Sequence, residues 1–301
     1  MCVVVIAASC GSDEVTQPTA TAPGFPITFT DDRGRTVTVE STERIIPLDG
    51  DVAEIVFALG LGDRVVATDL SATFPAEADA LPEIGYQRAL NTEPIVAFDP
   101  TIVIGTDIAG PPEVLRGLQD VGVPIVIVPS EPTPAGPAEK IKAVAVALGV
   151  PHDGEDLADD VAEQIASETV ADDQRGTGPR VLALYLRGTN VQLVLGEGSG
   201  IDWLIDAAGG VDVADDLGVV ETEPISAEAI LEAAPDVIVV PDAGLDSVGG
   251  LDGLWSIPGL EQTPAGKSRA VLAYDDQLML GNGSRTGEFL AQFRADLTAL
   301  E

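Results

Sequence analysis

The chain has 301 residues, of which 45% are hydrophobic and only 4% aromatic. This length suffices for one large domain or two lobes of ordinary size, and the hydrophobic fraction is too high for a disordered chain. Fifty acidic residues oppose 15 basic ones, so the formal net charge is -35. Such a charge argues against nucleic acid as a partner and against adsorption onto anionic lipid, because both favour a basic surface. An anionic ligand must therefore find its positive charge at individual arginines.

Both cysteines, Cys2 and Cys10, lie among the first ten residues, so the rest of the chain can form no disulfide and no thiolate metal site. The apolar run 2–8 is too short to span a bilayer. It leads into Ala-Ala-Ser-Cys10-Gly-Ser, which looks like a bacterial lipobox with Cys10 as the lipidated residue. We expect residues 1–10 to be the remnant of a lipoprotein signal and residues 11–26 to be a flexible tether. A signal peptide begins with basic residues, whereas the first one here is Arg33, so we expect the true start to lie upstream. The alternative is an apolar N-terminus that has no role in export.

The predicted elements follow a repeating order along the chain. Alternating apolar and polar residues at 27–39 predict a β-hairpin. Strands and helices then alternate, which favours a parallel sheet. The strands are expected at 44–48, 65–68, 101–105 and 123–128. The helices are expected at 51–59, at 113–121 and in a segment that ends at 95–98. Amphipathic helical segments at 138–148 and 156–170 come next, and the alternation restarts with a strand at 180–186.

The restart contains an internal repeat. A pattern of glutamate, isoleucine, proline and a β-branched strand at 93–104 recurs at 228–239, with a constant offset of 135 residues. This organisation resembles the periplasmic binding proteins of class III, whose two Rossmann-like lobes are joined by one long helix. The resemblance implies an α/β fold with an N-terminal lobe at 27–137, a connecting helical region at 138–175 and a C-terminal lobe at 176–301. It also implies that the lobes move little when a ligand binds.

The segment Ile84-Gly85-Tyr86-Gln87-Arg88-Ala89-Leu90 carries the sharpest functional signal. A phenol is a hard oxygen ligand suited to ferric iron, and tyrosine is a known axial ligand of haem. A nearby cation favours the phenolate, and Arg88 can supply one. If the segment is extended, residues 86 and 88 point to the same side. A surface tyrosine beside a solvated arginine is the alternative interpretation.

This segment resembles the substrate-binding lipoproteins of bacterial haem ABC importers, in which the tyrosine of a Gly-Tyr-x-Arg-x-Leu stretch ligates the iron. The resemblance implies haem as the transported ligand, Tyr86 as the metal ligand and Arg88 as its cationic neighbour. It also implies that Arg285, in the glycine-rich loop 281–287, faces the cleft, where its guanidinium would suit a haem propionate. Arg187, after the strand at 180–186, is a further cleft candidate. A solvent-facing arginine at a helix start is the other interpretation of Arg285.

In this class of proteins, one surface glutamate per lobe docks onto the permease dimer. Glu113 and Glu228, each at the start of a predicted helix, are the candidates. An acid in the first turn also stabilises a helix through its dipole, which needs no partner. The resemblance further implies a monomer outside the cytoplasm that is held to the cell membrane by a lipid anchor alone.

The sequence must also be compared with other ligands and with two other classes of function, an enzyme and an adhesive lipoprotein. The same fold could bind cobalamin or a ferric siderophore, although such relatives use aromatic platforms or several arginines. An enzyme is not expected, because His152 is the only histidine and no Walker loop or dinucleotide fingerprint is present. We expect His152 to lie in a solvated turn, and Met279 is a possible second axial ligand of the iron. An adhesive surface lipoprotein, which would bind no coloured ligand, stays open.

Overall fold

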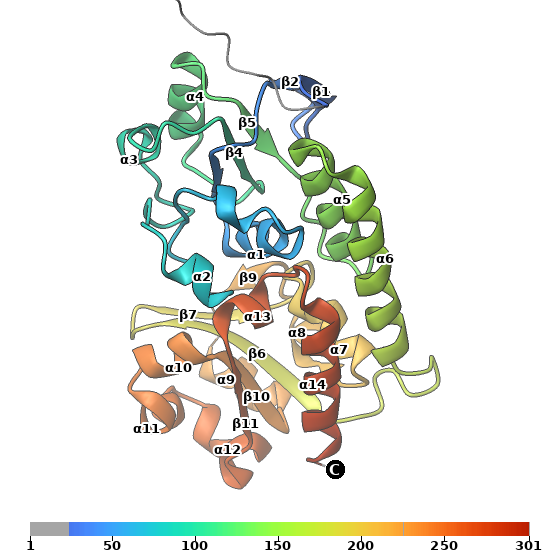
Figure 1. Cartoon of the computed structure of the whole chain (residues 1–301). Helices are drawn as coiled ribbons and strands as arrows, with labels where there is room; N and C mark the ends of the chain where they lie inside the picture. Colours follow the sequence, from blue (N-terminus) through green and yellow to red (C-terminus); the bar gives the residue numbers. More distant parts are fainter. Residues whose placement is uncertain (1–23, 225, 301) are drawn as a thin grey trace, which may run out of the picture.

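The computed structural model describes residues 24–224 and 226–300, so the predicted signal remnant, Cys10 and nearly all of the tether lie outside the described part. The described chain forms two α/β lobes, with helices α5 and α6 along one side of the molecule (Figure 1). None of the helices in the described residues is long and apolar enough to cross a membrane. The two α/β lobes confirm the predicted fold class.

The N-terminal lobe is built on a small parallel sheet. Strands β3 (Ile45–Pro47), β4 (Ile102–Gly105) and β5 (Ile125–Ile127) pair in that order and are fully buried. Its helices are α1 (Gly50–Ala58), α2 (Ala76–Asp79), α3 (Thr92–Val96) and α4 (Pro112–Asp120), with a 3-10 turn at Gly62–Arg64. The strand predicted at 65–68 was wrong, because Val65 and Thr68 make only isolated bridges with Ile45 and Glu83.

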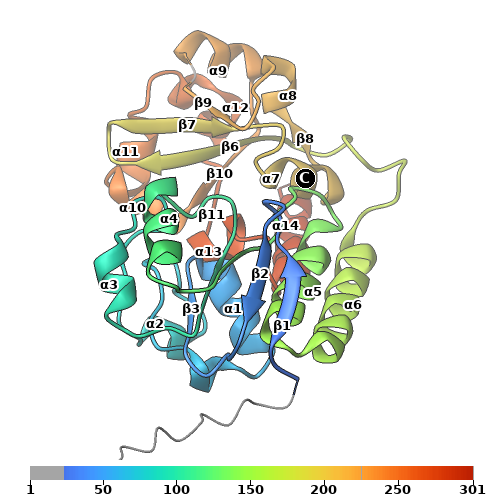
Figure 2. The same ribbon diagram turned by 90° about the horizontal axis from the view of Figure 1, so that it is seen from above.

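The predicted hairpin is confirmed. Strands β1 (Ile27–Thr30) and β2 (Thr36–Val39) pair antiparallel and lie near the end of α5, where Ile27 is close to Gly149 (Figure 2). Helix α5 (Gly136–Leu148) ends at Gly149, whose φ of +79° suits a residue without a Cβ. Helix α6 (Pro151–Glu168) begins earlier than predicted, with a proline in its first turn, so His152 is helical and exposed rather than in a turn. The connection is thus two packed helices.

The C-terminal lobe holds a six-stranded mixed sheet. The strands run in the order β11-β10-β6-β7-β9, and β8 pairs with β6; only β6–β7 and β7–β9 are antiparallel. The strands are β6 (Arg180–Arg187), β7 (Val191–Leu195), β8 (Val211–Asp212), β9 (Thr222–Glu223), β10 (Val237–Pro241) and β11 (Val271–Tyr274). The helices are α7 (Ile201–Ala207), α8 (Val213–Leu217), α9 (Ala227–Ala233), α10 (Asp242–Ser247), α11 (Gly250–Trp255), α12 (Pro264–Ser268), α13 (Asp276–Leu280) and α14 (Thr286–Thr298), with a 3-10 turn at Leu260–Gln262.

The sequence repeat corresponds to a real structural unit. Helix α3 and strand β4 in the first lobe have their counterparts in α9 and β10, and both starting positions differ by the same 135 residues. The proline that follows each helix ends it and the β-branched residues then form a buried parallel strand. The two lobes are therefore built from a common helix–strand unit.

One hydrophobic cluster extends through both lobes. It includes Ile55 of α1, Ile141 of α5, Val161 of α6, Val181 of β6 and Phe289 of α14, all at most 3% exposed. Helix α6 also packs directly on α14 (Figure 1). A continuous core of this kind transmits strain and resists hinge motion, because close-packed interiors deform little.

The buried carboxylate of Glu54 connects the two lobes through hydrogen bonds. Glu54 of α1 is 4% exposed and accepts hydrogen bonds from three groups of the loop before α14. These donors are Ser284 Oγ at 2.6 Å, the Arg285 backbone N–H at 3.0 Å and Arg285 Nε at 2.9 Å. The Arg285 guanidinium also stacks on Phe74, with its carbon 3.6 Å from the ring centroid. The buried charge of Glu54 is therefore balanced across the lobe boundary.

Two further polar contacts cross the same boundary. The Gln277 side-chain oxygen accepts from the backbone N–H groups of Thr73 and Phe74 at 2.8 and 2.9 Å, and its amide donates to the Gly50 carbonyl at 2.8 Å. Lys140, only 1% exposed, pairs with Asp51 and donates to the Gly281 carbonyl at 3.0 Å. Each contact fastens the start of α1 to the C-terminal lobe.

Replacing Arg285 by Ala should destabilise the protein by about 3 kcal/mol, because a buried carboxylate then loses its cation. The double variant Glu54→Gln, Arg285→Ala should recover much of this loss, since it removes the buried charge as well. Urea unfolding measures all three free energies. Arg269→Ala, which breaks an exposed ion pair with Glu261, serves as the control and should cost less than about 1 kcal/mol. Equal destabilisation in the single and double variants would contradict the role given to Glu54.

Candidate functional site

Tyr86 lies on a loop of the N-terminal lobe between α2 and α3, with a side chain that is 38% exposed. The loop turns at this point, because the Ala89 backbone N–H donates to the Tyr86 carbonyl at 2.7 Å. The extended conformation considered for 84–90 is therefore wrong, and the same-side argument for residues 86 and 88 does not apply. Arg88 is exposed and makes no hydrogen bond or ion pair within the described part of the chain. Its guanidinium is free to meet an anionic ligand.

Tyr185 of the C-terminal lobe is a neighbour of Tyr86. Tyr185 lies near the end of β6 and is half-buried. Its pKa is raised above the ordinary value, first by burial and then by a side-chain hydrogen bond with Tyr86, while the Arg187 charge acts to lower it. The influence of Tyr86 on this pKa indicates that the two side chains, 99 residues apart in sequence, are neighbours at the boundary between the lobes.

Sequence reasoning missed Tyr185. A signal for it exists, because Tyr185-Leu186-Arg187 repeats the Tyr-x-Arg spacing of Tyr86-Gln87-Arg88. The strand predicted at 180–186 concealed that signal, because it includes Tyr185 but not Arg187.

Arg187 is held against Tyr185. Its guanidinium carbon lies 4.4 Å from the centroid of the Tyr185 ring. One nitrogen donates to Asp276 of α13 at 2.6 Å, and another donates to the Leu186 carbonyl at 2.8 Å. This geometry puts a fixed positive charge on the face of a phenol, and a nearby cation stabilises the phenolate that a ferric ion requires.

The other predicted ligand residues are placed differently. Arg285 is engaged with Glu54 and Phe74, and its side chain is 17% exposed. Met279 is 1% exposed and belongs to the core cluster, so its sulfur is buried rather than open to a ligand. No group of three or more histidine, cysteine or acidic side chains in the described residues is arranged to hold a metal ion. The phenols and their arginines are therefore what this junction offers a metal complex.

The two candidate docking glutamates are exposed. Glu113 lies in the first turn of α4 and Glu228 in the first turn of α9. The internal repeat aligns Glu228 with Glu93, in the first turn of α3, rather than with Glu113. Docking by Glu113 and Glu228 stays a prediction.

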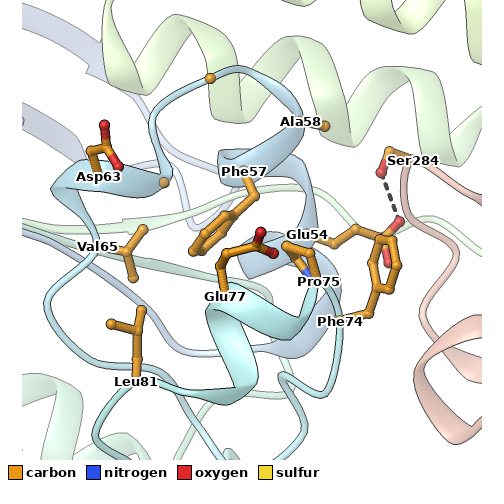
Figure 3. Close-up of a pocket in the computed structure, with 12 residues that line it drawn as sticks. Glu54, Phe57, Ala58, Asp63, Val65, Phe74, Pro75, Glu77, Leu81 and Ser284 are labelled. Carbon is orange, nitrogen blue, oxygen red and sulfur yellow. Dashed lines mark hydrogen bonds between the residues drawn. The ribbon is translucent and has the colours of Figure 1, made fainter.

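A cavity in contact with both lobes is a separate feature. It has a volume of about 650 Å³ and lies beside the end of α1 (Figure 3). Apolar side chains and three carboxylates surround it, and Ser284 of the other lobe closes one side by its hydrogen bond to Glu54 (Figure 3). Its lining residues are Glu54, Phe57, Ala58, Gly60, Gly62, Asp63, Val65, Phe74, Pro75, Glu77, Leu81 and Ser284. Tyr86, Tyr185 and their arginines do not line it, so this cavity is not the tyrosine site.

A family model for periplasmic binding proteins matches residues 45–278, which include both lobes and both tyrosines. The chain belongs to this family. It is accordingly an extracytoplasmic substrate-binding protein and not an enzyme, as the sequence predicted.

Solved structures of haem-binding proteins share the fold. The periplasmic haem-binding protein RhuT from Roseiflexus sp. RS-1 is 47% identical, with a TM-score of 0.82 over 86% of this chain and 99% of that one. The haem-binding protein HmuT is 36% identical, with a TM-score of 0.84 over 94% and 93% of the two chains. BhuT, solved with two haems, is 32% identical, with a TM-score of 0.77 over 85% and 98%. The predicted family resemblance is confirmed.

The curated relatives are named for a different ligand, vitamin B12. A vitamin B12-binding protein of Pectobacterium atrosepticum is 22% identical over 71% of this chain and 76% of its own length. Another, from Vibrio parahaemolyticus, is 34% identical over 30% of this chain, and the match spans only 33% of that protein. These relatives share the family, while the solved haem binders match more of the chain at higher identity.

Three buried acids, two in the N-terminal lobe and one in the C-terminal lobe, predict an unusual dependence of stability on pH. Burial is the main cause that raises the pKa of Asp49 from 3.8 to about 8, and of Asp69 and Asp212 to about 7. The folded protein therefore keeps protons that the unfolded chain releases above about pH 4. Its free energy of unfolding should fall as the pH rises from about 4 to about 8.

Thermal unfolding measures this dependence, and the midpoint at pH 5 should exceed that at pH 8. Repulsion among the acidic surface residues acts in the same direction in every variant. Asp49→Asn isolates the buried group, because an amide stays neutral at both pH values and should reduce the difference between the midpoints. An undiminished difference would show that Asp49 is not protonated in the fold.

Proposed function

We propose that this protein binds haem between its two lobes and delivers it to the permease of an ABC importer. The observation that carries the proposal is the pairing of a phenol with a cation at the lobe boundary, where the Arg187 guanidinium lies 4.4 Å from the Tyr185 ring centroid and Tyr86 of the other lobe is a neighbour. Phenol oxygen is a ligand for ferric haem iron, and the described residues contain no group of three or more histidine, cysteine or acidic side chains that could hold a metal instead. The solved haem-binding proteins of the same fold support this choice of ligand.

Each residue has a separate role in this proposal. Tyr86 binds the iron from the N-terminal lobe, and Tyr185 offers a second phenol from the C-terminal lobe. Arg187 lies on the Tyr185 ring and favours the phenolate. Arg88 has no acidic partner in the described residues, which leaves its planar guanidinium for a propionate. Arg285 was predicted to hold a propionate as well; its ion pair with Glu54 would have to be shared for that role.

Delivery follows from the family rather than from a bound partner. Binding proteins of this type hand their ligand to a permease dimer, and Glu113 and Glu228 are proposed to contact it, one in each lobe. Lipidation at Cys10 would keep a monomeric protein close to that permease, because a lipid anchor limits its diffusion to the membrane surface. The tether at 11–26 would leave the lobes free to turn.

Cobalamin is the second candidate ligand, and the names of the curated relatives favour it. A corrinoid is also a flat macrocycle, so it could lie between the same phenols. The paired phenols favour haem, since a hard anionic oxygen is suited to ferric iron. A ferric siderophore is less favoured because Arg88 is the only arginine at this junction without a partner in the described residues.

The proposal predicts that hemin binds saturably and that both phenols matter. Titration of the wild-type protein should give a Soret band with phenolate charge-transfer features. Tyr86→Phe and Tyr185→Phe keep the rings and remove only the oxygens, and each should weaken binding by at least about tenfold. The double variant should bind no hemin at a specific site. Tyr274→Phe is the control, because that phenol donates to Asp296 at 2.8 Å within the C-terminal lobe.

The outcomes separate the candidate ligands. Saturable hemin binding that survives in the double variant would keep haem as the ligand and reject both tyrosines. Saturable cyanocobalamin binding without hemin binding would favour the second candidate. Binding of neither would return the protein to the broader group of siderophore and adhesive functions.

A further inference from the structure

Arg187 is the last residue of β6 and lies over the ring of Tyr185, two residues before it on the same strand. Alternate residues of a strand share a face, so the Tyr-x-Arg spacing brings the two side chains together. The Arg187 side chain is nevertheless 38% exposed, and an arginine of this exposure has several rotamers available in water. Its position over the ring therefore needs contacts that select it.

Asp276, the first residue of α13, supplies the charged contact. One oxygen of its carboxylate accepts from Arg187 at 2.6 Å, which is the only ion pair of Arg187 in the described part of the chain. The other oxygen accepts from the backbone N–H of Ala243, in the first turn of α10, at 2.9 Å. Because both oxygens are engaged, the carboxylate is itself held in place and gives the guanidinium a fixed partner.

Helix α10 also lies close to the guanidinium. A second nitrogen of Arg187 donates to the Leu186 carbonyl at 2.8 Å. A Cβ at Gly244 would be 3.4 Å from that nitrogen and 3.2 Å from the Leu186 carbonyl oxygen, so α10 approaches the end of β6 closely. The Ser247 hydroxyl fastens this approach, because it accepts the Gly188 N–H at 2.9 Å and donates to the Gly244 carbonyl at 2.6 Å. The guanidinium thus lies in a frame formed by β6, α10 and α13.

The ion pair contributes little to the stability of the fold. Its two side chains are 38% and 25% exposed, and pairs of such exposure are worth at most about 1 kcal/mol. For a phenolate at Tyr185, Asp276 has two effects of opposite sign. It keeps the cation over the ring, which favours the phenolate, but its own negative charge disfavours the phenolate.

We propose that Asp276 is a positioning residue that holds the Arg187 guanidinium over the Tyr185 ring. The inference rests on the proposed haem function, because the position of Arg187 affects the ligand only if Tyr185 binds iron. Asp276 does not touch the haem. It acts through Arg187, and keeping the cation in place outweighs the repulsion from its own charge.

The test compares the wild type with Asp276→Ala, Arg187→Ala and the double variant. Asp275→Asn is the matched control, because it removes one negative charge from the adjacent residue and breaks no ion pair in the described chain. Asparagine also keeps an oxygen for the Leu278 N–H that Asp275 accepts at 2.9 Å at the start of α13. Two readouts are measured. NMR of the ligand-free protein follows the upfield shift that the Tyr185 ring current gives the Arg187 side-chain protons, and haem release to a scavenger is followed after loading.

Loss of Asp276 should free the guanidinium and speed haem release. In ligand-free Asp276→Ala the upfield shift of the Arg187 protons should decrease, whereas Asp275→Asn should leave it unchanged. Haem release should become about threefold faster in Asp276→Ala, a size typical of one partly exposed ion pair, and Asp275→Asn should not speed it. In the Arg187→Ala background, Asp276→Ala should speed release no further, because its effect passes through Arg187.

The sign of the effect separates positioning from simple charge. If Asp276 acted only through its charge, its removal would slow haem release, since the phenolate would lose a repelling neighbour. Slower or unchanged release in Asp276→Ala therefore overturns the inference. A persistent upfield shift in Asp276→Ala, or further acceleration in the double variant, also overturns it.

A second variant covers the case in which Asp276→Ala does not fold. Asp276→Asn has one oxygen for two donors, so it should show both changes at a smaller size, and their absence overturns the inference. Failure of the proposed function is a separate outcome. If the wild type binds no hemin, the haem proposal fails, while the upfield shift in the ligand-free proteins still decides whether Asp276 holds Arg187.

Discussion

The buried carboxylate of Glu54 is the constraint on which the site depends. The two tyrosines belong to different lobes, so they meet only if the lobes keep one relative position. Glu54 fixes this position through Ser284 and Arg285, and the shared hydrophobic core supports it from the other side. If a ligand binds at the phenols, it meets lobes that already keep their relative position, and little of its binding free energy is lost in closing the protein.

The distribution of charge shows where a protein of net charge -35 offers an anion a positive side chain. Most arginines in the described residues are neutralised by acids in ion pairs, including Arg187 by Asp276 and Arg285 by Glu54. Arg88 lies two residues after Tyr86 and has no such partner in the described part. A single unpaired cation beside the phenols marks the place where a propionate would find attraction, whereas the remaining acidic surface repels anions.

Local sequence patterns predicted most helices and strands, whereas contacts between residues far apart in the sequence could not be predicted. The repeated helix–strand unit was visible because a proline and a buried strand leave a regular pattern at 95–104 and 230–239. The strand at 65–68 failed because no neighbour pairs with it beyond isolated bridges. The partner of Arg285 lies 231 residues away, and nothing in either segment indicates that contact.

The two Tyr-x-Arg segments look alike in sequence and differ in structure. Arg187 is fixed on its tyrosine by Asp276 and lies at the end of a strand, whereas Arg88 is exposed on a loop. Strand β6 is part of the central sheet, so Tyr185 cannot shift without disturbing the core, but the Tyr86 loop depends on a few hydrogen bonds. If both phenols bind one iron, Tyr185 sets the position of the ligand and Tyr86 must adjust to it. The stability of the Tyr86 loop, rather than that of the sheet, would then govern how fast haem leaves.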